Sequence, residues 1–323
     1  MRNKNNTSPL ISLIVPVFNE EDSIAAFLEK AISVLENINI SFEILFINDG
    51  STDNTKNILL DLSRRDSRIK AINFSRNFGK EAAISAGIDF AGGDAVVPID
   101  VDLQDPPELI PIMVDHWKKG YDVVYGLRTS RDSDSFLKRV SSNLFYWLFN
   151  YLSPLKIPPD AGDFRLIDRK VVQVLKDMPE RNRFMKGLFS WVGFRSIPVP
   201  YERPARPKGK TKWTPWKLWN FALDGIFSFS SLPIRIWTYI GTGIAILSFI
   251  YGTFIVLRTL FCGIDLPGYA SMITIILFLG GVQLISIGIL GEYIGRIFIE
   301  SKNRPLYVIE STFPKNYSDD SSS

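Results

Sequence analysis

Two long stretches without charge constrain the fold of this chain more than any other feature. Residues 236–257 and 266–291 contain no Asp, Glu, Lys or Arg. A helix of 22 residues spans about 33 Å, which is enough to cross a bilayer core of about 30 Å. The sequence before about residue 230 has the mixed composition of a soluble domain. We therefore predict a soluble domain followed by two transmembrane helices, at about 236–257 and 270–291.

Basic residues flank this pair of helices on its outer sides. Lys217 and Arg235 precede the first helix, and Arg296, Lys302 and Arg304 follow the second. Cytoplasmic flanks of membrane proteins are enriched in Lys and Arg. The pattern predicts a multi-pass protein of the plasma or inner membrane, with the soluble domain and both termini in the cytoplasm. The glycines of the second helix permit close helix packing, and with it a homo-oligomer.

The segment before the first membrane helix is basic and then aromatic. Residues 203–217 contain Lys and Arg but no acidic residue, and the Trp- and Phe-rich pattern that follows suits a membrane interface. We divide the chain into a cytoplasmic domain, juxtamembrane amphipathic helices, the membrane hairpin and a C-terminal cytoplasmic tail. The predicted boundaries of these four parts are 1–212, 213–234, 235–298 and 299–323.

The first half of the chain alternates β-branched runs with helical patterns. Strands are predicted at 11–17, 42–47, 69–74, 95–100 and 122–127, with helices near 20–37, 53–64, 79–91 and 106–119. A further helix is predicted at 137–152, and a mixed strand–helix segment at 163–203. Such alternation favours an α/β fold, a mostly parallel sheet with helices on both faces. In these folds ligands bind beyond the carboxyl ends of the strands.

Composition excludes several classes of site and partner. The chain has one Cys and one His, so a disulfide framework and a multi-histidine metal centre are both excluded. Its net charge of +3 is too small to indicate a nucleic-acid partner. Any metal ion must therefore be held by carboxylate or amide oxygens.

Such oxygens gather after the fourth predicted strand. Asp100, Asp102 and Gln104 lie at the end of that strand. In extended chain, Asp100 and Asp102 would project to the same side. Carboxylate and amide oxygens suit Mg²⁺ or Mn²⁺, which complete their coordination with substrate phosphate oxygens. The pattern predicts a site for a divalent cation and a diphosphate.

Polar residues also follow the first two predicted strands. Asn19 and Glu20 end the first strand–helix turn, and Asp49 lies in the second. An Asn and a Glu at this edge can hold a nucleobase and its ribose hydroxyls, and Asp49 can accept the imide N–H of uracil. Taken alone, each turn is equally well explained as a capped helix start.

Together, and in this order, the three turns resemble the nucleotide-diphosphosugar transferases with a single Rossmann-like, glycosyltransferase A-type domain. The resemblance covers about residues 10–310. It extends to the segments 75–80 (SRNFGK) and 163–169 (DFRLIDR). The basic motif at 206–213 and the segment GEYIGR at 291–296 resemble those of polyprenyl-phosphate glycosyltransferases. That subgroup includes bacterial undecaprenyl-phosphate (bactoprenol) glucosyltransferases and, more distantly, dolichyl-phosphate mannose synthases.

The resemblance implies binding residues for a nucleotide-sugar and a metal ion. Asp100 would lie near the ribose and phosphates as a catalytic residue, while Asp102 and Gln104 would hold Mg²⁺ or Mn²⁺. The remaining donor-side residues that the resemblance implies are Pro16, Phe18, Glu20, Asp49 and Lys80.

The resemblance also implies residues for the lipid acceptor. Arg206, Thr211 and Lys212 would bind its phosphate, with Arg206 and Lys212 counted among the catalytic residues. Asp163 occupies the position usually given to a catalytic base. A lipid monophosphate is already mostly a dianion at neutral pH, because its second pKa is near 6. Asp163 would then orient a sugar hydroxyl or the basic cluster instead.

The resemblance implies an inverting glycosyltransferase of the cell envelope, acting in lipopolysaccharide or related glycan synthesis. It would transfer a hexose, with glucose from UDP-glucose favoured, to undecaprenyl phosphate on the cytoplasmic face and release UDP. One alternative uses the same acceptor with GDP-mannose or UDP-aminoarabinose. Another is a membrane scaffold that binds nucleotide-sugar without turnover. No short motif in the sequence distinguishes the sugars or the downstream glycan.

Overall fold

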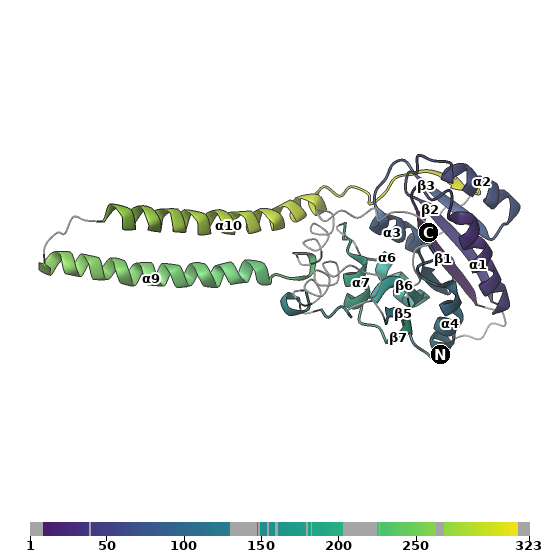
Figure 1. Ribbon diagram of the computed structural model, residues 1–323, viewed down its shortest axis with the longest axis horizontal. Coiled ribbons are helices and arrows are strands. Elements are labelled where there is room, and N and C mark those ends of the chain that lie inside the picture. Colours follow the sequence, from purple (N-terminus) through teal and green to yellow (C-terminus); the bar gives the residue numbers. More distant parts are fainter. Residues whose placement is uncertain are drawn as a thin grey trace.

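The structure is a computed structural model that describes most of the chain. The described residues are 9–38, 40–129, 147, 149–153, 155–158, 161–178, 180–181, 183–202, 225, 227–262 and 268–315. They form an α/β domain from which two long helices extend side by side (Figure 1). The predicted juxtamembrane helices at 213–234 and the helix at 137–152 fall mostly outside the described residues.

The domain is built on one eight-stranded sheet with the order β7-β5-β6-β4-β1-β2-β3-β8. Neighbours are parallel except where β6 meets β4 and β5, and where β8 meets β3. The α/β class and the mostly parallel sheet are therefore confirmed. The strands are β1 (Leu10–Val17), β2 (Ser41–Asn48), β3 (Ile69–Phe74), β4 (Ala95–Pro98), β5 (Val123–Arg128), β6 (Ala161–Asp168), β7 (Ser196–Tyr201) and β8 (Ile309–Phe313).

Helices cover both faces of this sheet. Successive strand residues point to opposite faces, so Leu13 and Val15 join one apolar cluster and Ile14 joins the other. The first cluster includes residues of α1 (Ile24–Asn37), α2 (Thr55–Arg65) and α4 (Ile110–Lys118), which follows the short helix η1 (Pro107–Leu109). The second includes residues of α3 (Lys80–Phe90), α6 (Arg169–Lys176) and α7 (Met185–Trp191). Both faces of the central strands are thus buried, as their near-continuous apolar sequences require.

The two long helices are α9 (Leu232–Cys262) and α10 (Tyr269–Ser301). Each contains a segment long and apolar enough to cross a membrane, at Leu232–Ile255 and Phe278–Ser301. The side chains of these segments are exposed, because the helices pack against little of the domain. Large exposed apolar surfaces of this kind are typical of segments that contact lipid.

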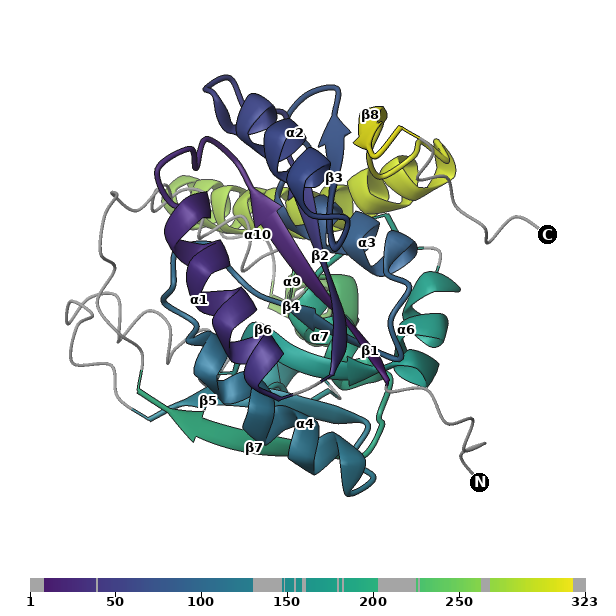
Figure 2. The same ribbon diagram turned by 90° about the vertical axis from the view of Figure 1, so that its right-hand side faces the viewer.

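The residues after α10 return to the sheet. β8 pairs with the edge strand β3, and Tyr307 stacks on Phe74 with ring centroids 5.0 Å apart. The predicted C-terminal tail at 299–323 thus contributes a strand to the sheet. The strands at the two edges of the sheet, β7 and β8, are those that precede and follow the helical hairpin in the sequence. Figure 2 shows β7 and β8 on opposite sides of the domain. The sheet is therefore linked to the hairpin from both of its edges.

Candidate active site

The turns after β1 and β2 are bonded to each other. The Asn19 N–H donates to Ser51 Oγ at 2.9 Å, and the Thr52 N–H donates to Asn19 Oδ1 at 2.8 Å. Asn19 has a positive φ of 52°, a conformation that Asn tolerates better than most residues. The Glu20 N–H donates to Thr55 Oγ1 at 3.1 Å. The two turns thus form one surface at the carboxyl edge of the sheet.

The residues expected to bind a nucleoside lie on or next to this surface. Pro16 lies in β1, and Phe18 and Glu20 follow it in the turn; all three side chains are half-buried. The Glu20 carboxylate accepts a hydrogen bond from Ser23 Oγ at 2.9 Å, within the same turn. These residues lie at the edge where ligands of such sheets bind.

Asp49 binds the loop that leads into α3. Its carboxylate accepts the N–H of Phe78 at 2.6 Å and that of Gly79 at 2.9 Å. Burial raises the pKa of Asp49, and these two hydrogen bonds offset the effect only in part. Next to it, Gly50 has a φ of +67° and leaves no room for a Cβ, which would lie 2.3 Å from the Arg76 carbonyl carbon. Asp49 therefore positions the 75–79 loop and retains lone pairs for one more donor.

Lys80 joins two of the predicted carboxylates. Its Nζ lies 2.8 Å from Asp100 Oδ1 and 3.0 Å from Asp163 Oδ2. Burial alone would lower the pKa of Lys80, but the charges of Asp100 and Asp163 outweigh it and raise the pKa above its usual range. The first turn of α3, the turn after β4 and strand β6 thus meet at one ammonium group.

Asp163 is held as an anion by its surroundings. Burial would raise its pKa, but the positive charges of Lys80 and Lys186 outweigh that effect and hold the pKa well below its usual range. Its other oxygen, Oδ1, is shielded from solvent and accepts no hydrogen bond from the described residues. A carboxylate with so low a pKa is a weak proton acceptor.

Sequence reasoning missed a second carboxyl group beside Asp163. Glu81 Oε2 accepts the Met185 N–H, the first of α7, at 3.0 Å. Burial, and then the charge of Asp163, raise the pKa of Glu81 to about 7. Residues 82–88 of the same helix are all buried. An acidic residue next to such an apolar run is the signal that could have identified Glu81.

The turn after β4 differs from the predicted extended chain. β4 ends at Pro98, and Leu103 has a positive φ of 57°. Asp102 Oδ1 accepts the Gln104 N–H at 3.1 Å, so the chain turns there. Asp100 and Asp102 are therefore not two residues of one extended strand, which was the basis for predicting that they project to the same side. The turn is fixed further along, where Asp105 accepts the hydroxyl of Tyr201 from β7 at 2.6 Å.

The same turn supplies a small oxygen-donor set. Asp102 and Gln104 are half-buried at the carboxyl edge, whereas Asp100 is already paired with Lys80. Within the described ranges, no three His, Cys, Asp or Glu residues come together as a metal-ligand group. Mg²⁺ commonly takes one or two carboxylates together with substrate phosphates. The turn therefore fits a cation shared with a diphosphate, and does not fit a cation held by protein ligands alone.

Arg206, Thr211 and Lys212, the predicted acceptor-phosphate residues, lie outside the described residues. The structure brings together Lys80, Asp100 and Asp163, with Asp49 bound to the loop just before Lys80.

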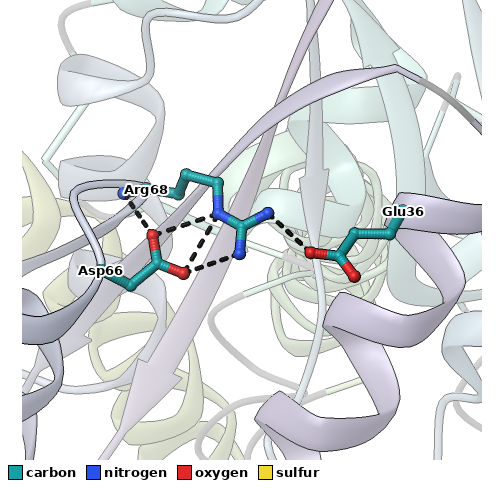
Figure 3. Close-up of polar contacts among 3 residues, drawn as sticks. All are labelled: Glu36, Asp66 and Arg68. Carbon is teal, nitrogen blue, oxygen red and sulfur yellow. Dashed lines mark hydrogen bonds and ion pairs between the residues drawn. The ribbon is translucent and has the colours of Figure 1, made fainter.

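A different ion cluster lies at the amino-terminal ends of the strands (Figure 3). Arg68 donates through Nε and Nη2 to Asp66 and through Nη1 to Glu36, at distances of 2.8–3.1 Å. It links the ends of α1 and α2 to the start of β3. The Arg68 and Glu36 side chains are 39% and 55% exposed, so water screens this pair.

The fold and the carboxyl-edge residues define a Rossmann-like domain of glycosyltransferase A type, followed by an apolar helical hairpin. Residues 12–175 match glycosyl transferase family 2, and residues 232–297 match the GtrB C-terminal hairpin. The chain belongs to glycosyl transferase family 2 and is a glycosyltransferase, as the sequence resemblance implied.

Relatives match over nearly the whole chain. An uncharacterised glycosyltransferase from Synechocystis is 52% identical over 307 residues, covering 95% of this chain and 96% of that protein. The bactoprenol glucosyl transferase of Shigella phage SfV is 52% identical over 301 residues, covering 93% and 98%. A crystal structure of glucosyl-3-phosphoglycerate synthase from Mycobacterium tuberculosis, in complex with Mn²⁺ and UDP-glucose, has a TM-score of 0.45. It is 19% identical and covers 68% of this chain and 77% of that one, a similarity too distant to bear on the site.

Proposed function

We propose that this protein transfers glucose from UDP-glucose to undecaprenyl phosphate, with inversion at the anomeric carbon. The observation that carries the proposal is the Lys80 ammonium group between Asp100 and Asp163, beside the turns expected to bind nucleotide. The similarity to bactoprenol glucosyl transferases supports both the sugar and the lipid acceptor. The apolar hairpin would keep the domain at the surface where such a lipid resides.

The chemistry is one displacement at the sugar. An oxygen of the acceptor phosphate attacks the anomeric carbon, and the bond from that carbon to the oxygen of the UDP β-phosphate breaks. The bonding electron pair leaves with UDP, so no proton has to be removed from the acceptor dianion. A strongly ionised Asp163 is consistent with this scheme, because the reaction needs no general base.

In this scheme the described residues bind and orient the substrates. Asp163 holds Lys80, and its Oδ1 would accept a hydrogen bond from a sugar hydroxyl. Glu20 and Asp49 would bind the nucleoside from the first two turns. Asp102 and Gln104 would hold Mg²⁺ or Mn²⁺, which when bound offsets the negative charge of the diphosphate leaving group.

The donor and the acceptor can be tested with the purified protein. Radiolabelled UDP- and GDP-sugars are supplied one at a time with undecaprenyl phosphate, and the lipid product and its anomeric configuration are determined. We expect transfer from UDP-glucose with inversion. Transfer from GDP-mannose or UDP-aminoarabinose instead would overturn the donor, and binding without turnover of any donor would indicate the scaffold.

We also propose that the α/β domain and both termini face the cytoplasm, since Arg235 and Arg296 lie on the outer flanks of the hairpin. The test uses Asp265→Cys and Glu310→Cys, each in a Cys262→Ser background, with a membrane-impermeant thiol reagent on intact cells. Labelling at 265 but not at 310 is expected. Labelling at 310 alone would reverse the orientation.

A further inference from the structure

The short helix α7 connects the charged cluster to the membrane side of the domain. At its first residue, the Met185 N–H bonds to Glu81 beside Lys80. At its last residue, Trp191 lines a cavity of about 410 Å³ together with Phe227, Phe229 and Tyr293 of the hairpin region. In Figure 1, α7 lies on the side of the domain from which α9 and α10 extend. The helix thus lies between the site and the hairpin.

Lys186 is the charged residue at the start of this helix. It lies close enough to Asp163 and Glu81 for its charge to act on both carboxyl groups. Within the described part of the chain its ammonium group makes no ion pair or hydrogen bond, although the side chain is half-buried. Asp163 is paired with Lys80 instead, at 3.0 Å.

The charged side chains nearest to Lys186 form their direct contacts with other groups. Asp100 and Asp163 share the single charge of Lys80, and Arg165 stacks on Phe189 at 4.0 Å while donating to the Gly162 carbonyl. A half-buried ammonium group that makes no hydrogen bond keeps its three donors for an incoming anion. Phosphate is the anion that both substrates of a phosphate-accepting glycosyltransferase contain.

We propose that Lys186 is a further phosphate-binding residue of the transfer site. The inference rests on the proposed function, because it takes its ligand from the proposed substrates. Two phosphates are candidates, the monophosphate of the lipid acceptor and the diphosphate of the donor. The acceptor is favoured because α7 packs on the segment that leads into α9: a Cβ on Gly187 would lie 2.4 Å from the Phe229 ring.

The test compares Lys186→Met with a matched exposed lysine, Lys118→Met on α4, in the full-length protein. The KM for undecaprenyl phosphate is measured with UDP-glucose saturating, and UDP affinity is measured by calorimetry with Mg²⁺. Loss of a charge-assisted bond costs about 1.5–3 kcal/mol, or roughly 10- to 150-fold in kcat/KM. We expect that loss at Lys186 through the acceptor KM, with UDP affinity unchanged, and no effect at Lys118.

Each other result is decisive. A loss of UDP affinity would assign Lys186 to the donor diphosphate, still as a phosphate ligand. If folded Lys186→Met keeps the wild-type acceptor KM and the wild-type UDP affinity, this inference is overturned. The proposed function still stands in that case, because the wild-type protein transfers glucose in the same assay. Lys186→Arg, which keeps the charge, should retain most activity, whereas Lys186→Gln should repeat the loss if the Met variant does not fold. Absence of transfer in wild type would instead contradict the proposed function.

Discussion

The two ends of the sheet both contain clusters of opposite charges, yet their bonding differs. At the amino-terminal ends, Arg68 donates to two carboxylates and lies in partial contact with water. At the carboxyl ends, Lys80 is shared by Asp100 and Asp163, while Asp163 Oδ1 has no hydrogen-bond partner among the described residues. A saturated, screened cluster needs no ligand. A part-buried cluster with a solvent-shielded, unused acceptor indicates a place where a substrate completes the bonding.

The largest effect should come from removing the metal ion at the carboxyl edge. If Asp102 and Gln104 hold the cation on the diphosphate, EDTA should reduce transfer to background, and Mg²⁺ or Mn²⁺ should restore it. Asp102→Asn removes charge without changing shape, so it should remain folded and lose most turnover. Full transfer by this variant in EDTA would exclude the assignment.

A second large effect is expected at Asp49. Asp49→Ala removes the acceptor of the Phe78 and Gly79 N–H groups and releases the loop before Lys80. The released loop must be ordered again when UDP binds, so UDP affinity should fall by roughly 10-fold, which corresponds to about 1.4 kcal/mol. Calorimetry with UDP and Mg²⁺ measures this directly. Asp61→Ala, at an exposed position of α2, is the control. An equal loss of UDP affinity in that variant would show that Asp49 has no particular role.

A smaller effect should appear in the pH dependence of stability. Glu81 is surrounded by Asp163, Lys80, Lys186 and the Met185 N–H, and its pKa is raised to about 7 from 4.5. Between these values the folded state keeps a proton that the unfolded state has released, so stability falls as pH rises from about 4.5 to 7. The Tm of the purified protein, followed from pH 5 to 8, should show this fall, and Glu81→Gln should flatten it. An unchanged slope in the variant would show that Glu81 titrates normally.

The smallest effect is predicted at the amino-terminal cluster. Arg68→Met removes ion pairs that are partly exposed, and such pairs contribute about 1 kcal/mol or less. We expect a drop in Tm of about 2–4 °C, typical of a domain of this size, and no change in transfer. A loss of transfer without a loss of Tm would mean that the two ends of the sheet are not functionally separate.

The sequence predicted the central part of this fold because its elements are local. The strands from β1 to β5 and the helices between them each follow from the period of apolar residues, to within a few residues. β8 was missed because its partner β3 lies more than two hundred residues earlier, beyond the apolar hairpin. Its β-branched sequence, VIESTF, was the available signal.

The candidate site was predictable in part for the same reason. Asp49 and Asp100 lie just after β2 and β4, and Lys80 begins the helix that follows β3, so the topology brings all three to one edge of the sheet. The Lys80 bridge to Asp163 and the roles of Glu81 and Lys186 depend on how α3, β6 and α7 pack. Side-chain packing of that kind leaves no regular spacing in the sequence.

The role of the Lys80 cluster as the transfer site can be measured through the transfer rate of Lys80→Met. The variant is compared with wild type and Arg68→Met, using UDP-glucose and undecaprenyl phosphate, with Tm measured in parallel. Removing one preorganised charge from a site costs about 100- to 1,000-fold in kcat. We predict a loss of that size for Lys80→Met and a wild-type rate for Arg68→Met. A folded Lys80→Met that transfers glucose at the wild-type rate would exclude the Lys80 cluster as the transfer site.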